Sequence, residues 1–508
     1  MRNVLEYLTA TAARLPDSPA YSDESGSFSF SETLSRVSAL GMELHRLTGA
    51  RNRPVGVMVR RDALSVLGCF AALWAGCFAA LWAGCFYVPL DAAMPADRLS
   101  AILEKLEPAA ILCGEKDRKQ EALLGSYAPL LRMDAACPAA RGEEPWRENL
   151  DTDPCYMIYT SGSTGVPKGI LISHRSVMDF IEWYAEITGV DETDRLGNQA
   201  PFFFDLSVKD IYLTLKTGAA TYVLPKKVFS FPVLLIRALD EQRITTLSWS
   251  TAAFHMTANS GVFEKYRPRY LKRALMGGEA MQAKQLNLWR QALPDVRYVN
   301  LYGPTETTVD CTWYPIDRPF GEGEPIPIGR ACANMEVLLL NEQDRLCAAG
   351  EVGEICARGT GLALGYFREP EKTAAAFVQN PLNPHWPDRI YRTGDLGWRD
   401  ESGLIWFAGR KDSQIKHNGY RIELGEIETA LNALPQLREA VCFFDREADR
   451  MVAVYAGELD AAGVVKGLRD RLPKYMIPEL LRQVPALPHL PNGKTDRVRV
   501  RREYEAEL

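Results

Sequence analysis

Residues 159–169 (YTSGSTGVPKG) are of types that can bind phosphate groups. The segment follows an apolar stretch, combines three glycines with four serines and threonines, and carries Lys168 next to its end. Such a loop can direct backbone N–H groups, hydroxyls and one ammonium group at phosphate oxygens. The Walker spacing GxxxxGK[ST] does not fit it. A flexible surface turn is the alternative when the segment is considered alone.

Four further segments contain side chains that could bind a ligand. Residues 301–308 (LYGPTETT) place an aromatic ring, a Gly-Pro turn and a carboxylate within six residues. Residues 391–398 (YRTGDLGW) present an aspartate at a turn, where it can bind the hydroxyls of a ribose. Charged residues are frequent in the other two, 409–428 (GRKDSQIKHNGYRIELGEIE) and 490–497 (LPNGKTDR). Phosphate-binding and ribose-binding groups in one chain predict a nucleotide site.

In this order, the five segments resemble the motifs of the adenylate-forming superfamily. It joins acyl-CoA synthetases, luciferases and the adenylation domains of nonribosomal peptide synthetases. The resemblance extends over almost the whole sequence. Residues 202–208 (FFFDLSV) look like the segment whose aspartate receives a substrate ammonium, so the sequence is most similar to amino-acid activators. Its C-terminal half (QIKHNGYRIELGEIE, LPKYMIP) is especially similar to stand-alone D-alanine–D-alanyl carrier protein ligases.

The resemblance implies ATP and Mg²⁺ as cofactors and gives roles to single residues. Lys494 is the predicted principal catalytic residue, because charge grows on the α-phosphate and a lysine there stabilises it. Glu306 is expected to hold Mg²⁺, with Thr305 near the α-phosphate. Within the ATP site, the 160–168 residues hold the β- and γ-phosphates, an aromatic ring stacks on adenine and an aspartate binds the ribose. The predicted ATP-binding residues are Thr160, Ser161, Gly162, Thr164, Lys168, Gly278, Asn300, Tyr302, Asp395 and Arg410.

The same resemblance predicts a substrate pocket in which Asp205 binds the ammonium group. Lys209 lies four residues after Asp205, on the same face if this segment is helical. Lys209 could bind the carboxylate of an acidic substrate, glutamate first. It could instead pair with Asp310 or Asp205 and leave a small uncharged substrate such as alanine or serine, or it could point away. D-alanyl ligases usually have cysteine at the Gly277 position and an apolar residue at that of Lys209, which weakens the D-alanine interpretation. The predicted pocket residues are Asp205, Leu206, Lys209, Ala253, Leu275, Gly277, Leu301, Val309, Asp310 and Lys494.

A two-step reaction is implied. An aminoacyl-AMP forms with release of pyrophosphate, and the acyl group then passes to a phosphopantetheine thiol. The C-terminal domain is expected to rotate about a hinge at Asp412, which brings the Gly419 strand towards the thiol tunnel. No LGGxS motif occurs in the sequence, so we expect the thiol on a separate carrier protein. We predict a large N-terminal adenylation domain (1–409) and a small C-terminal lid domain (410–508).

The elements that must position these residues alternate between helix and strand. Short apolar runs at 54–59 (PVGVMV) and 109–113 (AAILC) and a helix at 176–188 indicate βαβ units and a largely parallel sheet. Residues 115–153 are weakly patterned and are expected to connect two such units. Residues 326–407 contain short β-rich runs with Gly and Pro turns, typical of a small barrel or sheet. The predicted fold is α/β, with two βαβ subdomains, a β-barrel-like part and a small mobile α+β C-terminal domain.

Composition supports a cytoplasmic globular protein. Of the 508 residues, 47% are hydrophobic and 24% charged, and the net charge of −6 gives no general basic surface for nucleic acid or anionic lipid. The basic run at 497–502 (RVRVRR) is interpreted as a solvated face. Eleven cysteines without a CxxC pair favour reduced thiols. The first residues lack the apolar core of a signal peptide.

Residues 63–90 contain no charged side chain and are long enough to span a bilayer. Their length comes largely from a tandem repeat, since GCFAALWA at 68–75 recurs at 76–83. With one copy removed, an ordinary buried helix leading into a strand remains, so we expect no membrane insertion. Eight residues rotate a helix by roughly 80° beyond two full turns, so the second copy cannot extend a packed helix without consequence.

The sequence therefore predicts an amino-acid adenylating ligase that acts with a carrier protein. An acyl- or aryl-CoA ligase is the alternative of the same chemistry, disfavoured by Asp205. A non-catalytic nucleotide-binding regulator is the alternative of another class. The presence of Lys168, Glu306, Asp395 and Lys494 argues against it.

Overall fold

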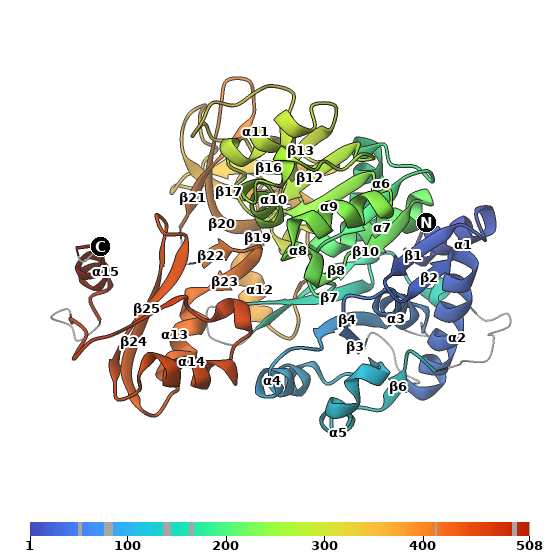
Figure 1. Cartoon of the computed structure of the whole chain (residues 1–508), viewed down its shortest axis with the longest axis horizontal. Helices are drawn as coiled ribbons and strands as arrows, with labels where there is room; N and C mark the ends of the chain where they lie inside the picture. The colour runs from blue at the N-terminus through green and yellow to red at the C-terminus, as the bar shows by residue number, and fades with distance from the viewer. Residues whose placement is uncertain are drawn as a thin grey trace. The chain divides into compact units, whose positions relative to one another are not determined.

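The protein is described by a computed structural model that covers residues 1–48, 53–75, 85–135, 144–161, 167–411, 414–489 and 495–506. The chain forms two compact units. The first contains Met1–Ala92, Leu106–Ile158 and Gly169–Lys411. The second contains Asp412–Leu508 together with Ala93–Lys105 and Tyr159–Lys168. Figure 1 follows the chain from its blue N-terminal elements to its red C-terminal ones.

A seven-stranded sheet has the strand order β18-β8-β7-β4-β3-β5-β6. Strands β7, β4, β3, β5 and β6 run parallel, and β18 pairs antiparallel with β8. Every residue of β3 is buried, as expected for a strand covered on both faces of a parallel sheet. The strands are β3 (Pro54–Val59), β4 (Phe86–Asp91), β5 (Ala110–Cys113), β6 (Leu130–Arg132), β7 (Pro154–Thr160), β8 (Lys168–Ser173) and β18 (Gly365–Tyr366).

A nine-stranded sheet has the order β15-β14-β13-β12-β11-β9-β10-β1-β2. Strands β1 and β9 to β13 are parallel, so their carboxyl ends meet at one edge, where open α/β sheets bind ligands. The strands are β1 (Pro19–Asp23), β2 (Gly26–Ser29), β9 (Arg195–Asn198), β10 (Ala220–Val223), β11 (Thr246–Ser250), β12 (Arg273–Gly277), β13 (Arg297–Tyr302), β14 (Thr312–Pro315) and β15 (Arg330–Ala331).

A third sheet of five antiparallel strands follows in the chain, with β21 paired to β20. It corresponds to the β-rich part predicted for residues 326–407. Its strands are β16 (Met335–Leu340), β17 (Gly353–Gly359), β19 (Phe377–Gln379), β20 (Arg389–Arg399) and β21 (Ile405–Arg410).

Helices pack on the two large sheets, and one apolar cluster includes residues of α3, α6, α7 and strands of both. Local signals set their ends: Ser173 caps α6 by accepting a hydrogen bond from the Ser176 N–H, and Gly189 ends it with φ +60°. The helices outside the C-terminal region are α1 (Leu5–Arg14), α2 (Phe30–Thr48), α3 (Ala63–Trp74), α4 (Ala96–Leu106), α5 (Glu121–Gly125), α6 (His174–Thr188), α7 (Leu206–Thr217), α8 (Lys226–Phe229), α9 (Pro232–Glu241), α10 (Thr251–Asn259), α11 (Ala283–Ala292) and α12 (Pro370–Ala376).

The C-terminal residues of the second unit form a hairpin and a three-stranded sheet. Asn418 and Gly419 have φ of +54° and +83°, the two positive values that a tight hairpin turn of type I′ needs. One apolar cluster lies between the sheet and helices α13 and α14, and a second includes residues of α15. The elements are β22 (Gln414–His417), β23 (Tyr420–Glu423), β24 (Leu437–Asp445), β25 (Arg450–Gly457), β26 (Leu480–Gln483), α13 (Leu424–Asn432), α14 (Ala461–Arg469) and α15 (Arg497–Glu505).

Most predicted elements are confirmed in place. The strand at 54–59 is β3, the run at 109–113 contains β5, and the helix expected at 176–188 is α6, which begins at His174. The connecting segment 115–153 is a partial correction, because it contributes α5 and the strand β6 to the fold. The second copy of the tandem repeat lies outside the described residues, and the first copy ends α3.

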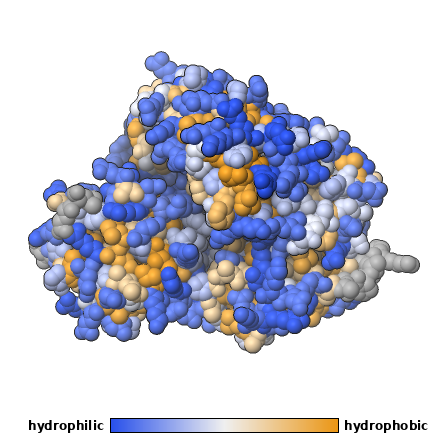
Figure 2. Space-filling view, in the orientation of Figure 1, coloured by the Kyte–Doolittle hydropathy of each residue, from blue (hydrophilic) through white to orange (hydrophobic). Residues whose placement is uncertain are grey.

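None of the helices in the described part of the chain is long and apolar enough to cross a bilayer. The face in Figure 2 is mostly hydrophilic, with apolar residues gathered at a few places. Among the large apolar side chains exposed anywhere on the surface are Phe231, Val233 and Leu234, at the start of α9. The nine described cysteines remain thiols.

Candidate functional site

The predicted adenine- and ribose-binding residues form one hydrogen-bonded group. Tyr302 ends β13, and its hydroxyl donates to Asp395 Oδ2 at 2.6 Å. Arg410 Nη1 donates to the other oxygen of Asp395, because β20 and β21 pair in a register that sets these two residues opposite each other. Burial and the Asp395 charge raise the pKa of Tyr302 well above its usual value, so its hydroxyl remains a donor. Three predicted residues, distant in sequence, therefore lie together.

Two further predicted ATP residues lie at the carboxyl ends of neighbouring strands. Asn300 is buried, and its Nδ2 donates to the Pro327 carbonyl at 2.9 Å. Gly278 follows β12 with φ +97°, and among the described residues a Cβ added there would meet only Leu206 Cδ1, at 3.7 Å. The backbone at Gly278 is thus open to close approach by a ligand.

Thr305 and Glu306 belong to a short 3₁₀ turn, Thr305–Thr307, directly after β13. Glu306 is fully buried, and its Oε1 accepts a hydrogen bond of 2.9 Å from the Tyr366 hydroxyl. Thr308 and Val309 follow with φ of +58° and +74°. A β-branched residue at such φ is strained, and strained turns are typical of functional sites.

The phosphate loop is described in part. Gly162 and Thr164 lie outside the described residues, whereas Thr160 ends β7 and Lys168 begins β8. The Thr160 hydroxyl is buried and makes no hydrogen bond with the part of the chain that the structure describes. The Ser161 hydroxyl donates to the Arg421 carbonyl at 2.8 Å, within the second unit. A buried hydroxyl that finds no partner among the described residues suits a phosphate ligand.

Most of the predicted substrate residues lie on β12 and β13, in the turn after β13 or at the start of α7. Asp205 precedes α7 and is half-buried. An added Cβ at Gly277 would be 3.4 Å from Leu301 Cβ, so these two residues are in contact. Leu275, Leu301 and Val309 belong to the main apolar cluster. Ala253 on α10 belongs to a separate cluster with Trp249 and Trp289.

Lys209 on α7 forms an ion pair with Asp310, which resolves one alternative left open by the sequence. Its Nζ lies 2.7 Å from Asp310 Oδ2, and the two side chains are 1% and 3% exposed. An added Cβ at Gly277 would be 3.6 Å from this Nζ and 3.3 Å from the Leu301 carbonyl. A larger residue at 277 would compete with the lysine for space. Lys209 does not point away from the predicted pocket.

The predicted second-step residues belong to the second unit. Gly419 occupies the tip of the β22–β23 hairpin. Asp412 and Lys494 lie outside the described residues, so their roles stay predictions. The domain prediction, 1–409 and 410–508, also stays a prediction. The two units part after Lys411, and the second also includes residues 93–105 and 159–168.

Tyr366, Thr308 and Asp210 have clear contacts to the site but are not among the predicted site residues. Tyr366 holds Glu306, and the Thr308 hydroxyl donates to the Gly361 carbonyl at 2.6 Å. Asp210, next to Lys209, is buried and accepts from Asn198 Nδ2 at 2.9 Å. Burial raises the pKa of Asp210 to about 7. A pattern signal existed for Asp210, a third charge in FFFDLSVKD, and none for Tyr366.

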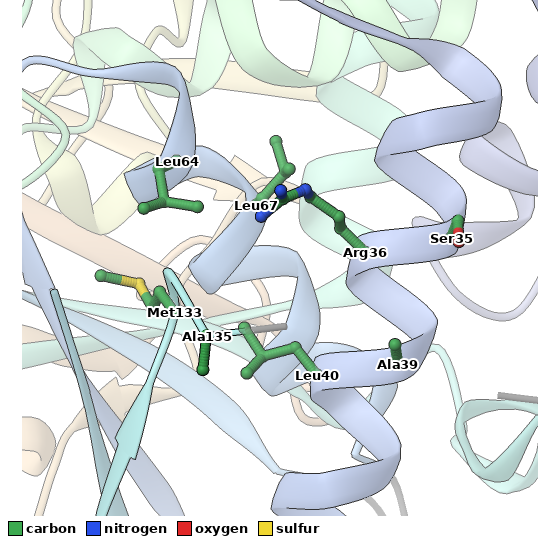
Figure 3. A pocket seen from close by; sticks show the side chains of 8 residues that line it. All are labelled: Ser35, Arg36, Ala39, Leu40, Leu64, Leu67, Met133 and Ala135. Atoms are coloured by element: carbon green, nitrogen blue, oxygen red, sulfur yellow. The ribbon is translucent and has the colours of Figure 1, made fainter. Parts of the chain in front are cut away.

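A hollow of about 230 Å³ lies away from these residues. In Figure 3 it is lined by Ser35, Arg36, Ala39 and Leu40 of α2, Leu64 and Leu67 of α3, and Met133 and Ala135 after β6. Within the described ranges, Arg36 is the one ionisable residue that lines it, and none of the predicted site residues does. It is therefore not a candidate catalytic site.

The residues fit a magnesium ion held by one carboxylate and by phosphates. Across the described ranges, no three His, Cys, Asp or Glu side chains are placed to hold a metal by themselves. Mg²⁺ usually binds one or two carboxylates together with substrate phosphates. The buried Glu306 carboxylate, oriented by Tyr366, is suited to the protein's share.

Comparison with known proteins identifies the family. A family model described as "AMP-binding enzyme" matches residues 8–367. The chain is 33% identical over 511 residues to surfactin synthase subunit 1 of Bacillus subtilis (strain 168), covering 97% of this chain and 14% of that protein. It is 33% identical over 499 residues to zwittermicin A synthase ZmaJ of Bacillus cereus, covering 95% and 92%.

Among solved structures, the chain is similar to holo-PA1221, a nonribosomal peptide synthetase protein with adenylation and PCP domains bound to a vinylsulfonamide inhibitor. The TM-score is 0.84 at 25% identity, covering 99% of this chain and 84% of that one. These findings confirm the α/β fold and the adenylate-forming superfamily. They do not bear on a special closeness to D-alanyl ligases. The chain belongs to the family of AMP-binding enzymes and is an adenylation domain of the nonribosomal peptide synthetase type.

Proposed function

We propose that the protein activates an amino acid with ATP and transfers it to the phosphopantetheine thiol of a carrier protein, in the cytoplasm. One observation carries the proposal. Leu301, a predicted substrate-pocket residue, and Tyr302, in the predicted nucleotide group, are consecutive at the end of β13. Amino acid and nucleotide would thus meet at one strand end, with Asp205 for the ammonium and Asp395 for the ribose.

In this reaction the protein contributes mainly the positioning of the reactants and the stabilisation of developing charge. A carboxylate oxygen of the amino acid forms a bond to the α-phosphorus, and the bond from that phosphorus to pyrophosphate breaks. Thr160, Ser161 and Lys168 would hold the leaving phosphates, and Lys494 would stabilise the charge on the α-phosphate. Mg²⁺, when held by Glu306, would neutralise phosphate charge. In the second step a C–S bond forms, the C–O bond to AMP breaks, and the thiol proton goes to solvent.

The Lys209–Asp310 pair favours a small, uncharged amino acid. Both charges are buried and already paired at 2.7 Å. A substrate carboxylate would bring a second negative charge or displace Asp310, and breaking a buried pair costs about 3–5 kcal/mol. Asp205 can neutralise the substrate ammonium and Lys494 its carboxylate, so an alanine- or serine-like substrate leaves no charge unmatched.

A screen of the amino acids by ATP–pyrophosphate exchange tests the function. We expect exchange with alanine or serine, none above background with glutamate or aspartate, and near-complete loss in Lys494→Ala. An acyl- or aryl-CoA ligase would instead respond to carboxylic acids lacking an amino group, and a regulator would show no exchange. Either result would overturn the proposal.

Variants of the ion pair test the substrate class. Lys209→Gln alone should lower exchange, because Asp310 is left buried without its ammonium. Lys209→Gln combined with Asp310→Asn should recover activity to within about tenfold of wild type, with the same small substrate preferred. Lys216→Gln, a more exposed lysine on the same helix, is the matched control. If the wild type prefers glutamate and Lys209→Gln shifts it to glutamine, the lysine binds substrate instead.

A further inference from the structure

Glu306 sits where its side chain cannot be oriented by solvent. It is fully buried in the 3₁₀ turn after β13. A glutamate has three rotatable side-chain bonds, and holding it in one orientation costs conformational entropy unless a partner fixes it. The Tyr366 hydroxyl, which donates to Oε1 at 2.9 Å, is such a partner.

Tyr366 is itself held from three sides. Its strand, β18, pairs antiparallel with β8, with Tyr366 opposite Ile170. Its N–H donates to Thr373 Oγ1 at 2.9 Å. Its ring packs edge-on against the Phe377 ring, with 5.7 Å between the ring centroids. The tyrosine hydroxyl is therefore presented at a set position.

The chain just before Tyr366 also holds the backbone of the Glu306 turn. The Ala363 N–H donates to the Glu306 carbonyl at 2.9 Å, and the Thr308 hydroxyl donates to the Gly361 carbonyl. Directly after the turn, Thr308 and Val309 have the strained φ values, which persist only when surrounding contacts enforce them. One segment, residues 361–366, thus fixes both the backbone and the carboxylate of Glu306.

We infer that Tyr366 is a positioning residue that holds the Glu306 carboxylate in the orientation for binding Mg²⁺ with ATP. The inference rests on the proposed function, in which Glu306 is the protein's metal ligand. Partners of a ligand side chain usually change metal affinity by about 10–100-fold when removed. Tyr366 touches neither metal nor substrate in this account and acts through Glu306.

Tyr366→Phe tests the inference, because it keeps the ring and its packing on Phe377 and removes the hydroxyl. Binding of Mn²⁺ in the presence of α,β-methylene-ATP is followed by the EPR signal of free Mn²⁺, which requires no turnover. We expect about tenfold weaker binding. The Mg²⁺ concentration that half-saturates exchange should rise by a similar factor, with the amino-acid KM at saturating Mg²⁺ within twofold of wild type.

Tyr298→Phe is the matched control. Tyr298 is the second residue of β13, the strand that precedes the Glu306 turn, and its buried hydroxyl lies within hydrogen-bond distance of the Trp289 and Leu293 carbonyl oxygens, at 3.0 and 3.1 Å. This variant should leave Mn²⁺ binding unchanged. Thermal unfolding of both variants checks that any change in metal binding does not follow from lost structure.

Glu306→Gln completes a double-mutant cycle. It should weaken Mn²⁺ binding by itself, and Tyr366→Phe added to it should change binding less than twofold. Unaltered Mn²⁺ binding in Tyr366→Phe, or equal effects of Tyr366→Phe with and without Glu306→Gln, would overturn the inference. If the wild type exchanges pyrophosphate with no amino acid, the proposed function is wrong. The Mn²⁺ measurement still decides the role of Tyr366 in that case.

Discussion

Two carboxylates near Lys209, those of Asp310 and Asp210, have different binding partners. Asp310 lies at ion-pair distance from the Lys209 Nζ. Asp210 instead accepts a hydrogen bond from the Asn198 amide. Burial raises the pKa of Asp210 to about 7, and the Asn198 hydrogen bond and the Lys209 charge only partly offset this. Asp210 is therefore a proton-binding group in the native state at pH values where an unfolded aspartate is ionised.

Asp210→Asn should become more stable relative to wild type as the pH rises from about 4 to 7. In that window the native state binds a proton that the unfolded state has lost, so the wild-type free energy of unfolding falls with rising pH. At pH 7 and above, the relative gain should be on the order of a few kcal/mol. Chemical denaturation of both proteins at pH 5, 6, 7 and 8 measures it.

Asp194→Asn is a control for which we expect the opposite change in stability. Burial alone would raise the pKa of Asp194, but hydrogen bonds from Lys272 and Thr245 and the charge of Arg273 lower it overall. Its ionised form therefore stabilises the native state above about pH 4, and the asparagine variant should be less stable at neutral pH. If Asp210→Asn shows no dependence on pH between 5 and 8, its carboxyl is not protonated in the native state.

For single residues, the sequence identified candidate site residues, and the structure identified the residues that they contact. Lys209 was recognised as a charged pocket residue, but its spacing from Asp205 could not decide its direction. Its partner, Asp310, lies 101 positions later and reaches it through the turn after β13. Tyr366 could not be found from pattern, because its contact with Glu306 depends on a two-residue strand that pairs with β8.

Among the elements, α3 carries the first copy of the tandem repeat. Phe70 is fully buried against Tyr21 and Tyr212, with ring centroids 5.9 and 5.6 Å apart. Trp74 packs so closely on α2 that a Cβ added at Gly41 would be 2.5 Å from Trp74 Cβ. Residues 68–75 therefore supply core contacts with β1 and α7 through Phe70 and with α2 through Trp74.

Deletion of residues 76–83 should give a soluble protein with a thermal midpoint close to that of the wild type. The contacts of Phe70 and Trp74 belong to the retained copy, and the remaining GCFAALWAGCFYVPL has the helix-to-strand spacing typical of the superfamily. Melting followed by circular dichroism measures the outcome. Phe70→Ala shows the sensitivity of the assay, with an expected cost of about 3–5 kcal/mol. An insoluble deletion variant would mean that the second copy belongs to the core.

Elements with strong internal patterns were predictable, and those that depend on a distant partner were not. The strand at Pro54–Val59 is apolar throughout, and the helix ending at Thr188 has a clear capping serine. By contrast, β6 has three residues and is a strand because it pairs with β5. Strand tendency depends heavily on such packing context.

At the scale of the whole molecule, the chain divides after Lys411, next to the predicted hinge at Asp412. The fold class could be predicted because alternating helices and strands have few packing solutions. The grouping of residues 93–105 and 159–168 with the C-terminal elements could not, because it follows from contacts between distant segments.

Asp412→Pro should leave adenylation close to wild type and slow transfer to the thiol severely. Proline fixes φ near −65° and restricts the backbone change that a hinge requires. Single-turnover assays of the two half-reactions measure both effects. Glu401→Pro is the control, since residue 401 is the second residue of an exposed turn closed by the Gly403 N–H to the Asp400 carbonyl, a favourable position for proline. Equal loss in both half-reactions would count against a hinge at Asp412.

The turn after β13 constrains how this enzyme could acquire a new substrate. Glu306 and Asp310 lie four residues apart on one strained segment, which folds back so tightly that a Cβ at Gly303 would be 2.5 Å from the Asp310 Cα. A substitution at Asp310 chosen to alter specificity would therefore also disturb the metal side of the proposed reaction. Lys209 contacts this segment through its ion pair with Asp310, but it lies on the separate helix α7, outside the strained backbone. Laboratory evolution towards other amino acids should accumulate its first productive changes on α7, and changes at 309–310 should appear later, accompanied by compensating substitutions at 361–366.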